Sequence, residues 1–90
     1  SAPASPADPL AADRAKAERL ARIIVSDIVL YNPEKFAAAA RSGGDVAAAM
    51  RDELAEGRAL FRERIDARVR AERDHLAEEL ARVAKARSGQ

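Results

Sequence analysis

Leu20-Ala21-Arg22-Ile23-Ile24-Val25-Ser26-Asp27-Ile28-Val29-Leu30-Tyr31-Asn32 decides the fold, because large apolar side chains fall on nearly every side of the helix it predicts. A surface helix carries one apolar stripe, whereas a helix that is hydrophobic most of the way round is enclosed by other elements. We therefore expect this helix to be surrounded. Because burying an unpaired charge is costly, its carboxylate, Asp27, is expected to pair with an arginine, with Arg58 as the candidate, or to cap nearby backbone. The alternative is that Asp27 belongs to a site that binds a partner.

The chain is short and has no covalent means of stabilisation. A domain of 90 residues buries only about 60% of the surface of its unfolded chain and is marginally stable alone. Cysteine is absent, which excludes disulfides and thiolate metal ligands. Self-association is the remaining route to a sufficient core, so we expect a homodimer.

Charge and hydropathy narrow the range of partners. The net charge is +1 with 34% charged residues, and the two signs alternate, which disfavours DNA or an anionic membrane as the main partner. No apolar run approaches the ~20 residues of a membrane span, and no basic region precedes an apolar one as in a signal peptide. We expect a cytoplasmic protein. Its first residue, Ser rather than Met, indicates a piece of a longer one.

Proline, glycine and aspartate divide the chain. Residues 1–8 are rich in proline and alanine and are predicted to be a disordered linker, residues 9–87 a helical domain, and residues 88–90 a disordered tail. Asp8-Pro9 predicts the start of a helix that ends near Tyr31, and Asn32-Pro33 predicts the start of a second helix. Ser42-Gly43-Gly44 ends the second helix, because glycine is favoured just past a helix C-terminus.

The remaining chain predicts one long helix. Asp45 caps it, and from Val46 to about Ala86 only Gly57 weakens it. About 40 residues at 1.5 Å each give a rod of ~60 Å. Gly57 lies on the apolar stripe and is predicted to mark a close crossing with another helix.

The expected fold is all-α, with a hairpin-like base of two helices and one long C-terminal helix in a dimeric bundle or coiled coil. When the first helix folds back, it covers only half of the long helix, so a second copy is expected to cover the distal seam. The predicted core and interface residues are Leu20, Ile23, Ile24, Ile28, Tyr31, Leu54, Phe61 and Ile65, with Val69, Leu76, Leu80 and Val83 in the distal contact.

Two sequence patterns bear on metal binding and on nucleic-acid binding. Glu72-Arg73-Asp74-His75 has the Glu-x-x-His spacing of di-metal bundles, but the opposing helix is mainly apolar, so we predict no metal, cofactor or catalytic residue, and a solvated His75. A strip of arginines is interleaved with carboxylates that favour salt bridges within the helix, although it keeps nucleic-acid binding as an alternative. The strip consists of Arg58, Arg62, Arg64, Arg68, Arg70 and Arg73.

A family resemblance covers about half of the chain. It rests on Leu20 to Asn32, Glu34-Lys35 and Asp52 to Arg58, and it is most specific at Ser26-Asp27, Leu30-Tyr31-Asn32 and Glu56-Gly57-Arg58. This pattern resembles the C-terminal helical module of delta-proteobacterial multi-domain regulatory proteins, of the zinc-ribbon, signalling or motility type. The resemblance implies an accessory module and no activity.

The expected function is therefore a non-enzymatic oligomerisation or protein-interaction module of a larger bacterial regulatory protein. Two alternatives stay open: a helical nucleic-acid-binding module, and a docking site for a helix of a different protein without self-association.

Overall fold

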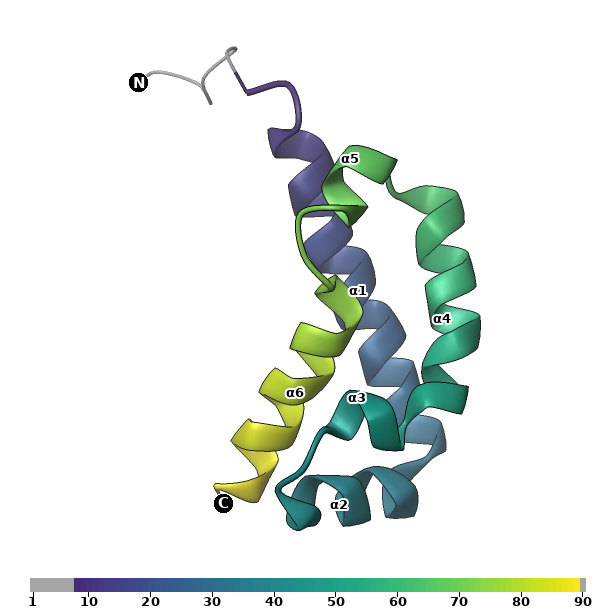
Figure 1. Ribbon diagram of the computed structural model, residues 1–90, viewed down its shortest axis with the longest axis vertical. Coiled ribbons are helices and arrows are strands. Elements are labelled where there is room, and N and C mark those ends of the chain that lie inside the picture. Colours follow the sequence, from purple (N-terminus) through teal and green to yellow (C-terminus); the bar gives the residue numbers. More distant parts are fainter. Residues whose placement is uncertain (1–7, 90) are drawn as a thin grey trace.

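A computed structural model of the chain describes residues 8–89. Residues 1–7, where the linker is predicted, and Gln90 lie outside the described residues. The described part is all-helical, without a strand, and measures 44 × 29 × 20 Å (Figure 1). Its six helices are α1 (Ala11–Tyr31), α2 (Pro33–Ser42), α3 (Val46–Ala49), α4 (Arg51–Arg64), α5 (Ala67–Arg70) and α6 (His75–Ser88).

In the first half of the chain, proline and glycine lie at the predicted helix boundaries. Helix α1 ends at Tyr31, and Pro33 is the first residue of α2. Gly43 then ends α2 in the left-handed conformation, with φ of 73°, which costs glycine nothing. The side chain of Asn32 does not cap α2; its Nδ2 donates to the carbonyl of Ile28 at the end of α1 (2.8 Å). Asp8 likewise lies before α1, where it accepts from the Leu10 amide (3.2 Å).

The prediction of one long helix after Asp45 is wrong, because the chain forms four helices there. The break at Met50 is slight, since the amides of Met50 and Leu54 still bond to carbonyls four residues back. The break at Ile65 is sharp, because this residue is extended (φ −111°, ψ 132°). Asp66 caps the amide of Arg68 (2.8 Å) and Asp74 caps that of Ala77 (3.1 Å), so each new helix has its own N-cap.

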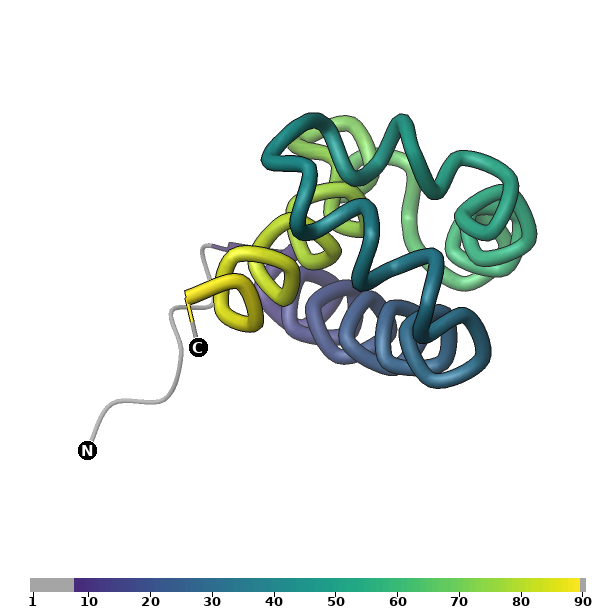
Figure 2. Tube along the Cα trace, turned by 90° about the horizontal axis from the view of Figure 1, so that it is seen from below, coloured from purple at the N-terminus to yellow at the C-terminus, as the bar shows by residue number. Residues whose placement is uncertain are grey.

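Breaking the helix folds its distal half back onto the chain. Helix α6 packs against α1, α2 and α3, while α4 packs against α1 beside α6, which it also contacts (Figures 1 and 2). The predicted intermolecular distal seam is therefore wrong: Val69, Leu76 and Leu80 are fully buried within one chain, and Val83 is half-buried. A continuous rod would leave these side chains in water, whereas the folded-back helix buries them at the loss of a few helical hydrogen bonds.

The crossing of α1 and α4 confirms the role predicted for Gly57. A Cβ built on Gly57 would lie 2.5 Å from Cγ2 of Ile24. Such a contact is far inside van der Waals distance, so α1 and α4 approach this closely only because position 57 has no side chain.

The core is one cluster shared by all the helices. Of the predicted core residues, Ile24, Ile28, Leu54, Phe61 and Ile65 are buried, and Leu20 packs at the edge. Phe36 and Met50 are also fully buried. Among the described residues, no helix is both long and apolar enough to cross a bilayer.

Candidate functional site

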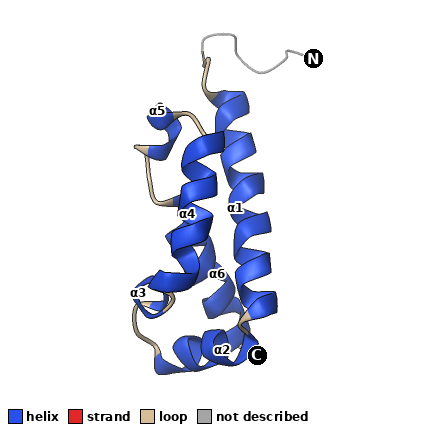
Figure 3. Ribbon diagram, turned by 90° about the vertical axis from the view of Figure 1, so that its right-hand side faces the viewer, coloured by secondary structure: helices blue, strands red, loops and turns tan. Residues whose placement is uncertain are grey.

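The side of α1 that faces away from α4 and α6 is the most unusual surface of the described chain. Ile23, Leu30 and Tyr31 are 59%, 67% and 77% exposed, and these three large apolar side chains all belong to α1. In Figure 3 this helix forms one edge of the molecule. The expectation that α1 is enclosed on every side is therefore wrong for the single chain, and Ile23 lies on the surface instead of in the core.

These residues share one face because of helical spacing. Ile23, Asp27 and Leu30 follow one another at intervals of four and three residues, and Arg19 lies four residues before Ile23. We call this surface, Arg19, Ile23, Asp27, Leu30 and Tyr31, the outer face of α1. Neither Arg19 nor Asp27 forms a salt bridge with any of the described residues, so both charges are free to contact another molecule.

A groove borders the outer face on the side of α4. Its volume is about 490 Å³, and Ile24, Ile28, Gly57 and Leu60 contribute apolar surface to it. Asp27 and Tyr31 belong to both the outer face and this groove, so the two surfaces are continuous. On the α4 side, Glu53 accepts a hydrogen bond from Lys35 (2.9 Å), which lowers the pKa of its carboxyl.

The structure does not form the predicted pair between Asp27 and Arg58. Asp27 is exposed, and Arg58 forms a two-pronged salt bridge with Asp74 (both 3.0 Å) that lowers the pKa of that carboxyl. Arg58 does not reach Asp27 because of the direction in which it points from α4. Gly57 is the residue of α4 that meets α1, and the next residue points about 100° further round the helix, toward the loop before α6.

His75 is buried, contrary to the expectation that it is solvated. This residue is 3% exposed, its ring centroid lies 5.4 Å from that of Phe61, and its Nδ1 has no hydrogen-bond partner within residues 8–89. Burial lowers the pKa of the imidazole, and the charge of Arg73 lowers it further. Among the described residues, no group of three or more His, Cys, Asp or Glu side chains is arranged to hold a metal ion. Sequence reasoning missed this burial, although Asp74 directly before it is a typical helix-capping residue.

The predicted arginine strip is divided by the breaks in the helix. Arg58, Arg68 and Arg73 form salt bridges with Asp74, Asp66 and Glu78, respectively. These three charges are therefore largely compensated. Arg62 and Arg64, by contrast, form no salt bridge with the residues that the structure describes.

A comparison with known protein families finds no match, and no curated protein or solved structure is significantly similar. The resemblance to the delta-proteobacterial regulatory module therefore stays a prediction.

Proposed function

We propose that this domain is a non-enzymatic interaction module that forms a homodimer through the outer face of α1. The observation that carries the proposal is the gathering of the exposed large apolar side chains of residues 8–89, Ile23, Leu30 and Tyr31, on one helix. An exposed apolar surface rimmed by polar groups is typical of a protein-binding site.

The charges on the outer face favour a second copy as the partner, in an antiparallel orientation. Arg19 and Asp27 lie four residues before and four residues after Ile23. When two α1 helices pair antiparallel about Ile23, Arg19 of each copy lies level with Asp27 of the other. A parallel pair would instead place like charges side by side. The face is thus self-complementary in one orientation, as a two-fold interface requires.

The same pairing covers the apolar side chains. Leu30 lies seven residues after Ile23, and Lys16 lies seven before it. In the antiparallel pair each Leu30 therefore packs on the aliphatic stem of Lys16 in the second copy, whose ammonium remains in water. If the chain belongs to a larger regulatory protein, as the resemblance implies, this contact pairs two copies of that protein.

The oligomeric state in solution tests the proposal. We expect light scattering over a dilution series to show a dimer that dissociates on dilution. Ile23→Asp is expected to give a monomer with unchanged helix content, because Ile23 lies outside the core. The matched control is Ala38→Asp, which adds the same charge at an exposed position on α2. The sole tyrosine, in a chain without tryptophan, is Tyr31, so its fluorescence reports on this face.

Charge reversal tests the orientation. Arg19→Glu and Asp27→Arg are each expected to weaken the dimer, since each places like charges together twice. The double variant exchanges the two charges and is expected to restore it. A chain that stays monomeric at all concentrations refutes self-association. Binding of a helix from a different protein to this face would then remain, as would nucleic-acid binding, which weakens steeply with salt.

A further inference from the structure

A second surface of the molecule gathers positive charge around a pocket. The pocket lies between α4 and the segment that joins α5 to α6, and has a volume of about 310 Å³. Arg58 and Arg62 of α4, Arg70 of α5, and Arg73 before α6 line it, and Asp74 is its single carboxylate. We call this the arginine pocket. It is remote from the outer face of α1, with which it shares no residue.

Two of the four arginines form no salt bridge with the described residues, although the charge of Arg70 acts weakly on the Asp66 carboxylate. Arg58 is held by Asp74, and Arg73 by Glu78 (2.7 Å) and Glu18 (3.6 Å). Arg70 donates through Nε to the carbonyl of Ile65 (3.0 Å), which leaves its two terminal nitrogens free for other acceptors. Within residues 8–89, neither Arg62 nor Arg70 has a carboxylate within 4.0 Å.

A buried polar group lines the same pocket. His75 contributes to the lining, yet it is 3% exposed and its Nδ1 has no hydrogen-bond partner among the described residues. Nδ1 has essentially no solvent-accessible surface, so a ligand in the pocket does not reach this atom. His75 is therefore a reporter group beside the pocket and not a ligand contact.

We propose that the arginine pocket binds a small dianion of the phosphate type between Arg62 and Arg70, beside His75. The two guanidinium groups line the pocket from different helices, α4 and α5, and a tetrahedral anion has oxygens that point in several directions to meet them. Guanidinium groups bind such oxygens through charge-assisted hydrogen bonds, often in pairs. The volume is at the small end of the range for ligand sites, which favours a small molecule.

The chain carries its own probe for a binding experiment. His75 is its one histidine, so the carbon-bound protons of its ring give a single set of NMR signals. We expect these signals to shift and saturate when inorganic phosphate is added to the full chain at constant ionic strength. Arg62→Gln is expected to weaken binding at least about fivefold, because one charge-assisted contact is lost.

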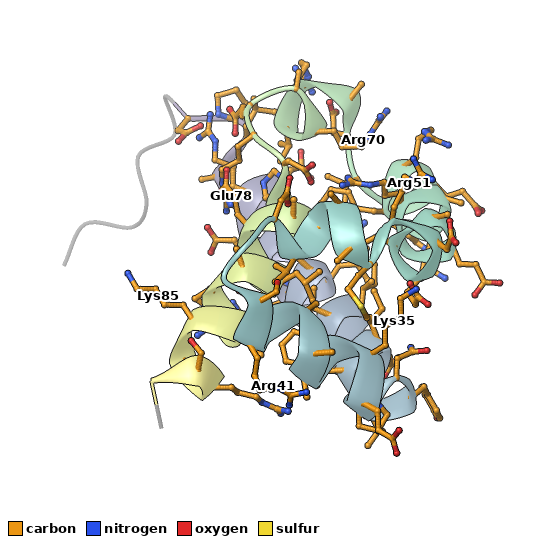
Figure 4. All side chains as sticks on the ribbon, turned by 60° about the horizontal axis from the view of Figure 1, so that its bottom comes forward. Lys35, Arg41, Arg51, Arg70, Glu78 and Lys85 are labelled. Carbon is orange, nitrogen blue, oxygen red and sulfur yellow. The ribbon has the colours of Figure 1, made fainter. Side chains whose placement is uncertain are left out.

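Arg41→Gln is the matched control. It removes the same charge from an exposed position on α2, at the opposite end of the molecule from Arg70 (Figure 4), and is expected to leave the phosphate affinity unchanged. Neither variant removes a salt bridge between described residues, so both are expected to fold.

Three results would overturn the proposal. The first is a shift that grows linearly with phosphate and is reproduced by chloride, which indicates ionic screening alone. The second is an equal loss in Arg62→Gln and Arg41→Gln. The third is saturable binding of duplex DNA, weakened by Arg62→Gln, without saturable binding of phosphate; this result would favour the nucleic-acid alternative. Tyr31 fluorescence, which reports on the outer face of α1, distinguishes a failure here from a failure of the proposed dimer.

Discussion

Residues 11–31 and residues 46–88 use the same types of residue, yet the first stretch forms one helix and the second forms four. Both stretches are rich in alanine and arginine with a recurring apolar stripe. Local helix propensity therefore does not explain the difference. It lies in where each stretch can bury its apolar side chains, since packing contributes most of the stability of helices in proteins.

Helix α1 is central to the fold because four other helices, α2, α4, α5 and α6, pack against it. Its inner residues Ala17, Ala21, Val25 and Val29 are buried, so a straight helix of 21 residues satisfies the core. The later stretch has no such neighbours unless it turns back. At Ile65 and between Ala71 and Asp74 it gives up helical hydrogen bonds, replaces some of them with aspartate caps, and places Leu76 and Leu80 against α1.

The largest effect is expected from Leu80→Asp, which tests whether α6 is held by burial of its apolar side chains. Leu80 is fully buried, so an unpaired charge there is expected to cost about 3–5 kcal/mol, a large part of the roughly 5–15 kcal/mol that stabilises a typical native protein. We expect circular dichroism to show loss of helix at 25 °C. If residues 46–86 instead formed one continuous helix with an intermolecular seam, Leu80→Asp would give a monomer that keeps its helix content.

The neighbouring position supplies the control for that experiment. Ala81 is exposed on the same helix, so Ala81→Asp adds the same charge without burying it and is expected to leave the chain folded. If Leu80→Asp also stays folded with unchanged helix content, then α6 does not dock on α1 as described.

The next largest effect is expected from Gly57→Ala. Alanine improves helix propensity by about 1 kcal/mol, but its Cβ would lie 2.5 Å from Ile24 Cγ2, and overpacking of this kind costs about 1–3 kcal/mol. We expect a net destabilisation of about 1 kcal/mol in urea denaturation. Gly44→Ala is the control, because its Cβ would meet only Ser42 Oγ at 3.7 Å.

A double-mutant cycle shows whether the contact with Ile24 is the cause. Ile24→Ala alone removes buried side-chain volume and destabilises the domain. In the Ile24→Ala background the Cγ2 atom is gone, so Gly57→Ala is expected to become neutral or stabilising. A penalty that stays the same in both backgrounds would contradict the close crossing of α1 and α4.

Much of the fold could be predicted from single residues whose effect is local. Pro33 at the start of α2, Gly43 at its end and Asp45 as the cap of α3 act through backbone geometry and short hydrogen bonds, which the sequence shows directly. Gly57 could be predicted because it interrupts an apolar stripe. The breaks at Asp66 and Asp74 could have been predicted from the same cap signal, but a strong helical period through Phe61 and Ile65 outweighed it.

The surfaces were harder to predict, because they depend on the angle at which helices meet. The apolar character of residues 20–32 indicated an enclosed helix, but the phase of α1 against α4 leaves Ile23 outside and Ile24 inside. The same phase separates Asp27 from Arg58. The burial of His75 also follows from the return of α6, since in a continuous helix this residue lies beside the seam.

A smaller effect is expected at the cap of α6. Asp74→Ala removes the hydrogen bond from the Ala77 amide and the salt bridge to Arg58, and is expected to cost about 1 kcal/mol, mostly from the cap. Asp74→Asn keeps a capping oxygen and loses only the charge, so it is expected to cost less in thermal denaturation. An equal loss in both variants would place the stabilisation in the salt bridge.

The smallest effect is expected at Asp66 and appears only in acid. Hydrogen bonds from the Arg68 guanidinium (2.9 and 3.1 Å) and then from its amide lower the pKa of this carboxyl from 3.8 to about 2. Between these two values the unfolded chain binds more protons than the folded chain, so the stabilisation is complete above about pH 4 and is lost as the pH falls toward 2.

Asp66→Asn keeps a capping oxygen but does not titrate, so its melting temperature is expected to fall less steeply over this window. The carboxyls of Glu72 and Glu79, whose pKa values are also lowered by arginines, titrate in both proteins, and the difference between the two slopes therefore belongs to Asp66. Identical slopes would show that the charge of Asp66 contributes no stability beside Arg68, and the turn after Ile65 would then depend on the uncharged cap and on core packing.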